Sequence, residues 1–150
     1  MIDACAAPGN KTTHLAAIMG GKGRVDAFER DSKRCELMRE RVEGAGAGRV
    51  VRVTQGNFLD IDLRSLAFAD VSSILLDPTC SGSGMAQRID HWARKQHDEN
   101  DESSRILALA EFQKTLIKHA LSGPAVKKVV YSTCSVHKVV CGVVAHISLE

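Results

Sequence analysis

The stretch DACAAPGNKT, residues 3–12, joins a short apolar start to a helical pattern. A strand that turns through small residues into a helix is typical of the first βα unit of an open parallel sheet, where this turn meets the ligand. Small side chains let the backbone approach a ligand closely, and the helix N-terminus offers free N–H groups to a carboxylate or phosphate. The turn alone is equally consistent with a tight connection that binds nothing. Its small residues are Ala4, Ala6, Ala7 and Gly9.

Beyond this turn, short apolar runs alternate with longer helical patterns, which predicts an α/β fold with a mostly parallel open sheet and helices on both faces. The expected strands are Val25–Phe28, Val50–Thr54, Ser73–Leu76 and Val129–Tyr131. The expected helices are Lys11–Met19, with Leu15 and Ile18 on one side, Asp31–Val42, with Cys35, Met38 and Val42 on one side, and Ser103–Leu121. In the last helix the inward face is expected to comprise Ile106, Leu109, Ala110, Gln113, Leu116, Ile117 and Ala120. Because only Met1 and Ile2 precede Asp3, the chain is expected to begin inside its first strand.

Composition favours one ordinary globular unit over residues 1–150. The chain has a net charge of +2 and is 44% hydrophobic but only 4% aromatic, so Val, Leu, Ile and Ala are expected to form the core. The polar segment Ala93–Arg105 is expected to be an exposed loop. No apolar run reaches the roughly 20 residues of a membrane span, so a soluble intracellular protein with no membrane partner is expected. Five cysteines without a CxxC spacing predict free thiols, with no metal site.

Glu29 is a second indication of a ligand at the turn. It follows the second expected strand, about 20 residues after Gly9, where a carboxylate can accept hydrogen bonds from both hydroxyls of a ribose. The turn lacks the three glycines of a dinucleotide site and the spacing of a phosphate loop, so an adenosine ligand without phosphates fits better. Asn57, after the third strand, is placed to contact an adenine edge, although a turn-forming Asn after Gly56 is at least as good an interpretation.

The last two expected strands each lead into a cysteine. Cys80 lies in ILLDPTCSGSG, residues 74–84, and Cys134 lies in VVYSTCS, residues 129–135. Both turns are rich in Pro, Gly, Ser and Thr, which expose a side chain. Asp77, beside Cys80, either caps its own turn or hydrogen-bonds a substrate, and two neighbouring cysteines favour the second role. The remaining cysteines, better explained as small buried hydrophobes, are Cys5, Cys35 and Cys141.

Taken together, DACAAPGNKT, DPTCSGSG and YSTCS resemble the Sun-domain family of S-adenosylmethionine-dependent RNA cytosine-5 methyltransferases. Supporting matches are AFERD at residues 27–31, GNFLD at 56–60 and LAEFQKTLIKHAL at 109–121. GNFLD and DPTCSGSGM are most similar to the eukaryotic branch that modifies large-subunit ribosomal RNA. The resemblance implies a Rossmann-like methyltransferase core, truncated at both ends, with S-adenosylmethionine as cofactor and RNA, in this branch ribosomal RNA, as partner.

The resemblance also implies a role for each site residue. Cys134 would add as a thiolate to C6 of cytosine, so that C5 becomes nucleophilic enough to attack the sulfonium methyl. Cys80 would assist release of the methylated base, and Asp77 would hold the N3 and N4 edge of the ring. The target base would have to be flipped out or presented unpaired. The implied cofactor-binding residues are Ala6, Ala7, Pro8, Gly9, Asn10, Lys11, Glu29, Arg34, Asn57 and Asp77.

The sequence departs from the family pattern at three places. Asn57 stands where the family usually has Asp, Thr79 stands where Pro or Ser is more common, and the tail after Ser135 lacks the usual acidic run. One alternative is therefore a cofactor- or RNA-binding fragment without catalysis. A nicotinamide-dependent dehydrogenase shares the architecture, but it would need the missing glycines and would leave two cysteines unexplained. The family branch implies a monomer in the nucleus and nucleolus. The basic residues, Lys22, Arg24, Lys33, Arg34, Arg39, Arg41, Lys127 and Lys128, are expected to form a solvated surface.

Overall fold

The computed structural model describes residues 1–85 and 99–137. Within these residues the strands form one parallel sheet in the order β3-β2-β1-β4-β5. The strands are β1 (Ile2–Asp3), β2 (Val25–Glu29), β3 (Val51–Gln55), β4 (Ser73–Leu76) and β5 (Lys128–Tyr131). The helices are α1 (Asn10–Ile18), α2 (Ser32–Gly44), the 3₁₀ helix η1 (Phe58–Asp60) and α4 (Glu99–Leu121). The α/β class with a parallel sheet is therefore confirmed.

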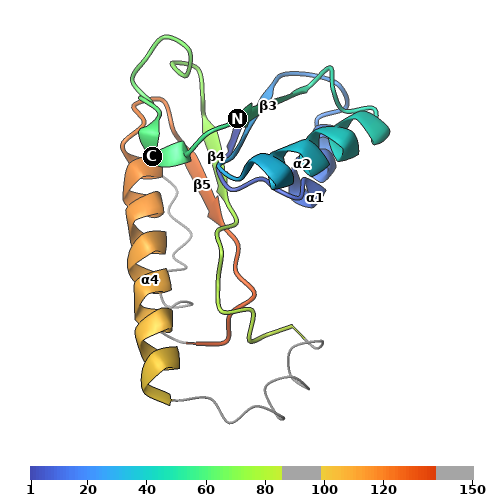
Figure 1. Ribbon diagram of the computed structural model, residues 1–150. Helices are drawn as coiled ribbons and strands as arrows, with labels where there is room; N and C mark the ends of the chain where they lie inside the picture. The colour runs from blue at the N-terminus through green and yellow to red at the C-terminus, as the bar shows by residue number, and fades with distance from the viewer. Residues whose placement is uncertain (86–98, 138–150) are drawn as a thin grey trace.

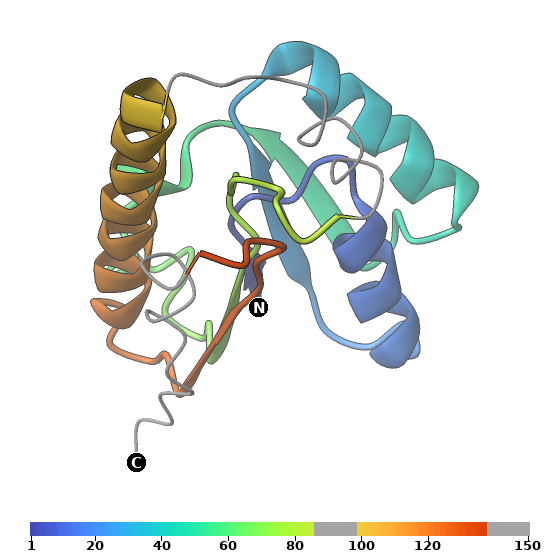
Figure 2. The same cartoon turned by 90° about the horizontal axis from the view of Figure 1, so that it is seen from below.

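Helices cover both faces of the sheet. Figures 1 and 2 show α1 and α2 against one face and α4 against the other. The sheet separates two apolar clusters, one that includes Met38 and Val42 of α2 and one that includes Leu116 and Ala120 of α4. Strand β2 is buried along its whole length. Its residues serve both clusters, because successive side chains of a strand point to opposite faces.

The strand order reverses between β1 and β4. The chain runs outward from β1 through β2 to β3, and then returns to place β4 and β5 on the other side of β1. In an open parallel sheet, such a reversal leaves a crevice at the carboxyl ends of the strands, and ligands bind there. The fold thus predicts a site formed by the turns that follow β1, β2, β4 and β5.

The start of α4 corrects the prediction of an exposed loop over Ala93–Arg105. Helix α4 begins at Glu99, so the prediction is wrong for residues 99–105, and residues 93–98 lie outside the described part. A helix of 23 residues is about 35 Å long, which is longer than these short strands. Its first turns extend beyond the sheet (Figure 1) and need no apolar face, and an exposed Glu102–Arg105 ion pair of 3.0 Å lies there.

Helix α1 also differs from its expected form, because Ile18 is 70% exposed and the buried residues are Thr12 and Ala16. Small side chains allow α1 to lie close to the sheet, and the Thr12 hydroxyl donates to the buried Asp3 carboxylate. The inward faces of the other two helices are confirmed at Cys35, Met38, Val42, Ala110, Gln113, Leu116 and Ala120. Element ends differ from the expected ones by one or two residues elsewhere.

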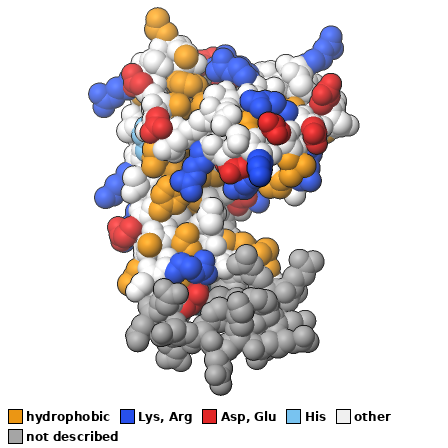
Figure 3. Space-filling view, viewed as in Figure 1, with side chains coloured by type: hydrophobic (Ala, Val, Ile, Leu, Met, Phe, Trp, Pro, Cys, Tyr) orange, Lys and Arg blue, Asp and Glu red, His pale blue; other side chains and the backbone are white. Residues whose placement is uncertain are grey.

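The described surface carries both signs of charge. Figure 3 shows Lys and Arg side chains interspersed with Asp and Glu side chains over this face, without a single basic patch. No helix of residues 1–85 or 99–137 is long and apolar enough to cross a membrane.

Candidate active site

A cavity of about 600 Å³ lies at the carboxyl ends of the strands. Its volume falls in the range of small-molecule sites. The turns after β1, β2, β4 and β5 all contribute to its wall, as the strand order predicts. The expected site residues that line it are Ala7, Pro8, Lys11, Glu29, Arg34, Asn57, Asp77, Cys80 and Cys134.

Three of the expected cofactor-binding residues do not line the cavity. Ala6 is buried in the apolar cluster beneath α1 and α2, and its amide donates to the Phe28 carbonyl. Gly9 caps the start of α1 with φ of 97°, and a Cβ there would lie 3.2 Å from Cγ of Met38. Asn10 is exposed, at the first residue of α1. These residues shape the turn, and their side chains do not line the cavity in this ligand-free structure.

Glu29 ends β2 at the cavity with only 6% of its surface exposed. Its Oε1 accepts a hydrogen bond from the Asp31 amide at 2.9 Å, and its Oε2 lies 3.5 Å from the Arg34 guanidinium. Arg34 also donates to the Ala7 carbonyl at 2.6 Å, so it connects the acid to the turn after β1. The carboxylate is fixed in place and still lines the cavity, an arrangement suited to accepting hydrogen bonds from a polar ligand.

The Lys11 ammonium and the Asp77 carboxylate form an ion pair across the reversal in strand order, with Nζ and Oδ2 2.5 Å apart. Both side chains are partly exposed, at 47% and 32%, so this pair contributes little to stability. It matters more as a link between two parts of the site. Lys11 lies in the first turn of α1, which follows β1, and Asp77 directly follows β4.

Asn57 lines the cavity and also performs the local role that its sequence context suggests. Its side-chain oxygen accepts from the Leu59 amide at 3.2 Å, and its amide nitrogen donates to Asp60 at 3.3 Å. These contacts cap the start of η1. The turn-forming interpretation is therefore observed, and an adenine contact stays a prediction.

The thiols of Cys80 and Cys134 meet at the cavity wall, with their Sγ atoms 2.8 Å apart. Desolvation raises the pKa of Cys80, but hydrogen bonds from Cys134 and the Gly82 backbone outweigh it, so the pKa of Cys80 lies below its ordinary value. Burial, the neighbouring Cys80 and the Asp77 carboxylate raise the pKa of Cys134. The contact between the two thiols thus favours a thiolate at Cys80 over one at Cys134.

Other cysteines differ in chemistry. Cys5 also lines the cavity, but burial and the nearby Asp3 and Glu29 raise its pKa to about 12, so it stays a thiol. Cys35 is fully buried on the inward face of α2. Both fit the expectation of small hydrophobes, and Cys141 lies outside the described residues. Within residues 1–85 and 99–137, no cluster of three metal-ligating side chains is present.

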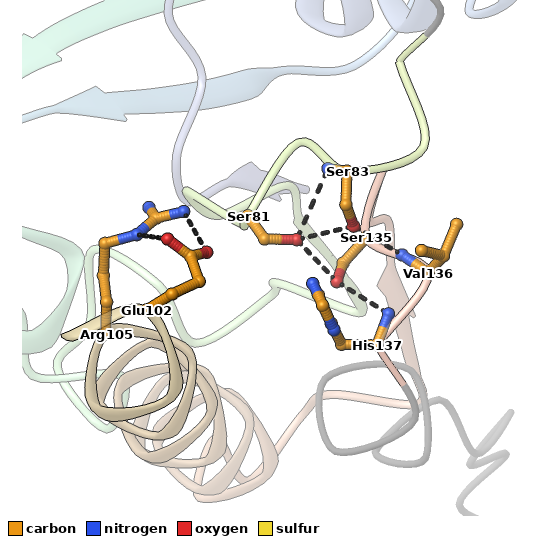
Figure 4. A network of polar contacts seen from close by, with 7 residues as sticks. All are labelled: Ser81, Ser83, Glu102, Arg105, Ser135, Val136 and His137. Carbon is orange, nitrogen blue, oxygen red and sulfur yellow. Dashed lines mark hydrogen bonds and ion pairs between the residues drawn. The ribbon is translucent and has the colours of Figure 1, made fainter. Parts of the chain in front are cut away.

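Side-chain and backbone hydrogen bonds fasten the turn after β4 (residues 77–85) to the turn after β5 (residues 132–137). The Ser81 hydroxyl donates to Ser135 at 2.8 Å, the Val136 amide donates to Ser83 at 3.0 Å, and Figure 4 shows this network. The Gly84 amide donates to the Cys134 carbonyl at 2.8 Å. A Cβ at Gly84 would lie 2.9 Å from that carbonyl oxygen, so only glycine allows this approach. Sequence reasoning missed this network, although the run of Ser and Gly around both cysteines was its signal.

Fold and cavity together place the chain among the Rossmann-like methyltransferases. The family described as 16S rRNA methyltransferase RsmB/F matches residues 1–145, and the chain belongs to that family. A solved structure, NSun6 from Pyrococcus horikoshii with SFG, superimposes with a TM-score of 0.68 and 29% identity over 93% of this chain and 33% of that one.

Two curated relatives are similar over nearly all of the chain. The 25S rRNA (cytosine-C(5))-methyltransferase rcm1 of Schizosaccharomyces pombe is 45% identical in a match that covers 97% of this chain and 32% of that protein. The 25S rRNA (cytosine-C(5))-methyltransferase NSUN5 of Arabidopsis thaliana is 43% identical over 93% of this chain and 25% of that protein. The chain therefore spans about a third or less of the length of these relatives.

Proposed function

We propose that this chain is the catalytic core of an enzyme that transfers a methyl group from S-adenosylmethionine to C5 of cytosine in ribosomal RNA. The observation that carries the proposal is the pair of thiols at the wall of a cavity that also holds Glu29 and the turn after β1. The names of the curated relatives support the reaction and the RNA. By the same comparison we propose a nuclear, nucleolar location.

The cavity fits the cofactor on the evidence of its own residues. It is large enough for a nucleoside, and Glu29 offers fixed carboxylate oxygens for the ribose. The polar edge of Asn57 lies on the same wall. The solved relative with SFG, an analogue of S-adenosylmethionine, supports this assignment. When bound, the cofactor supplies an electrophilic methyl group.

The thiol pair supplies the nucleophile. The proton of Cys134 passes to Cys80 across their 2.8 Å contact, and the Cys134 sulfur then adds to C6 of the cytosine. The added electron pair makes C5 nucleophilic toward the methyl group, and Asp77 holds the N3 and N4 edge of the ring. Cys80 passes the proton that it received to solvent, and after methyl transfer its thiolate accepts the C5 proton. The C5–H electron pair restores the double bond between C5 and C6, the bond between C6 and sulfur breaks, and its electron pair returns to Cys134. We assign Cys80 to assisting this release.

Cofactor binding is tested by calorimetric titration of S-adenosylmethionine into the fully reduced chain. Glu29→Gln removes the charge that accepts the ribose hydroxyls, so we expect Kd to rise about tenfold to a hundredfold, the scale of hydrogen bonds to a charged group. Glu36→Gln, on the exposed face of α2, is the matched control and leaves Kd unchanged. Equal affinity in the chain and Glu29→Gln would contradict the assignment of Glu29.

The chemistry is tested with ribosomal RNA and cofactor carrying a labelled methyl group. We expect Cys134→Ala to abolish labelling of cytosine, while Cys35→Ala, which removes a buried thiol outside the cavity, retains it. We expect Cys80→Ala to accumulate a covalent RNA adduct that survives denaturant on a gel. Labelling by Cys134→Ala would overturn the nucleophile. Cofactor binding without any labelling by the unaltered chain would favour the alternative, a cofactor- or RNA-binding fragment without catalysis.

A further inference from the structure

Gln113 of α4 is the only polar side chain on that helix with no exposed surface among those of residues 102–121. Its Nε2 donates to the Thr79 carbonyl at 2.9 Å, and its Oε1 accepts from the Tyr131 hydroxyl at 2.7 Å. Thr79 precedes Cys80 in the turn after β4, and Tyr131 ends β5, directly before the turn that carries Cys134. One amide therefore connects α4 to both thiol-bearing segments.

The chemistry of these two contacts selects a primary amide. The Thr79 carbonyl can only accept, so its partner must donate, and the neighbouring atom must accept from the Tyr131 hydroxyl. Methionine has nearly the volume of Gln113 but neither group, and a glutamate carboxylate would face a carbonyl with no proton to offer. A buried amide is costly unless both ends are paired. Both ends of Gln113 are paired, to elements that meet at the site.

The contact between the two thiols depends on the separation of these segments. The serine network and the Gly84 amide fasten the two turns to each other. Gln113 links α4 to both segments, at Thr79 in the turn after β4 and at Tyr131 at the end of β5. A shift of one segment by a fraction of an ångström would lengthen the 2.8 Å contact between the sulfurs.

We infer that Gln113 is a positioning residue that sets the separation of the Cys80 and Cys134 thiols. The inference deepens the proposed function, because it names what holds the two reacting groups together. Gln113 itself does not line the cavity and touches no substrate.

The test is site-resolved alkylation with iodoacetamide between pH 6 and 9, quantified by peptide mass spectrometry. In the unaltered chain we expect Cys80 to react as a thiolate at lower pH than an ordinary thiol, because the hydrogen bond between the two thiols lowers its pKa. In Gln113→Met we expect the rate at Cys80 near pH 7 to fall about tenfold, equivalent to about 1.4 kcal/mol, the size of one hydrogen bond. Its pH profile should move toward that of an ordinary thiol.

The same digest contains the control for folding. Cys35 is fully buried, so its alkylation stays slow while the variant is folded. Thr115→Ala is the matched control on α4, because its hydroxyl is exposed and bonds only within the helix, to the Glu111 carbonyl. It should leave both thiol profiles unchanged.

An unchanged Cys80 profile in folded Gln113→Met would overturn the inference. If Cys35 becomes reactive in that variant, Tyr131→Phe decides instead, since it removes only one of the two contacts. A shift of the Cys80 profile in the same direction supports the positioning role, and an unchanged profile refutes it. The measurement needs neither cofactor nor RNA, so its failure is distinguishable from failure of methyl transfer.

Discussion

At the scale of single residues, the reactive part of the site followed from strand ends. Asp77 and Glu29 each come directly after an apolar run, and Cys80 and Cys134 lie in the turns that follow β4 and β5. Parallel strands bring such positions to one edge of the sheet. Gln113 was not recognised, because its position in an apolar periodic pattern concealed the chemistry of its side chain. A polar residue at an inward position was the available signal, but its partners lie 34 and 18 residues away in sequence.

Asp3 carries a prediction about pH. Desolvation raises its pKa from 3.8 to about 6, against the opposing hydrogen bond from Thr12. Between these two pH values Asp3 is protonated in the folded state and ionised in the unfolded state. The contribution of Asp3 to the free energy of unfolding is therefore complete below pH 4 and is lost as the pH rises through 6. The expected loss is about 3 kcal/mol for a shift of roughly two pKa units.

Urea denaturation at pH 4, 5, 6 and 7 measures this effect. In Asp3→Asn the free energy of unfolding should not show this decrease between pH 4 and 6, because an amide does not titrate in this range. The comparison concerns the slope with pH and not the absolute stability, because the amide changes the pairing of the buried side chain. Asp70→Asn, an exposed carboxylate, serves as the control. If the free energy of unfolding changes with pH at the same slope in the unaltered chain and in Asp3→Asn, the titration of Asp3 is not the cause of the pH dependence.

At the scale of elements, periodicity located the helices but not their full extent. The first residues of α4, ENDESSR at 99–105, show no apolar period, and a sequence without an apolar face cannot be told from a loop by its pattern. In α1 the pattern favoured the larger residues Leu15 and Ile18, whereas the helix buries Thr12 and Ala16. Small side chains are needed on the face of α1 that lies close to Asp3. This requirement comes from tertiary packing, which the periodicity of the sequence does not reveal.

The N-cap of α2 offers a prediction at the same scale. The Asp31 carboxylate accepts from the Arg34 amide at 2.9 Å and so satisfies one of the free N–H groups of the first turn. Asp31→Ala should lower the free energy of unfolding by about 1 kcal/mol, measured by urea denaturation. Glu36→Ala removes a carboxylate from the exposed side of the same helix and should cost much less. An equal loss in both variants would mean that charge, and not capping, is responsible.

At the scale of the whole molecule, the parallel architecture was predictable from the alternation of strands and helices, because parallel strands need long crossover connections. The strand order was not predictable, because the sequence alone does not show on which side of β1 the fourth strand pairs. That return brings Lys11 and Asp77 together from 66 residues apart. The cavity is a property of this topology and belongs to no single motif.

The division of the core by the sheet predicts independent effects on its two sides. Val42 belongs to the cluster under α1 and α2, and Val129 belongs to the cluster under α4. Each Val→Ala change should cost about 2 kcal/mol from lost burial and the remaining cavity. The costs should add to within about 0.5 kcal/mol in the double variant, measured by urea denaturation. A coupling energy above about 1 kcal/mol would show that the sheet transmits packing changes between the clusters.

The sequence separation of 54 positions between Cys80 and Cys134 has a consequence for synthesis on the ribosome. Chains emerge from their N-terminus, and the early parts begin to fold first. The turn after β1 and Glu29 are complete long before β5 has been made, whereas Cys80 gains its partner only when β5 joins the edge of β4. A nascent chain therefore carries the part of the cavity that we propose for the nucleoside before its two thiols can meet. The order of translation keeps the two thiols apart until the last described strand is in place.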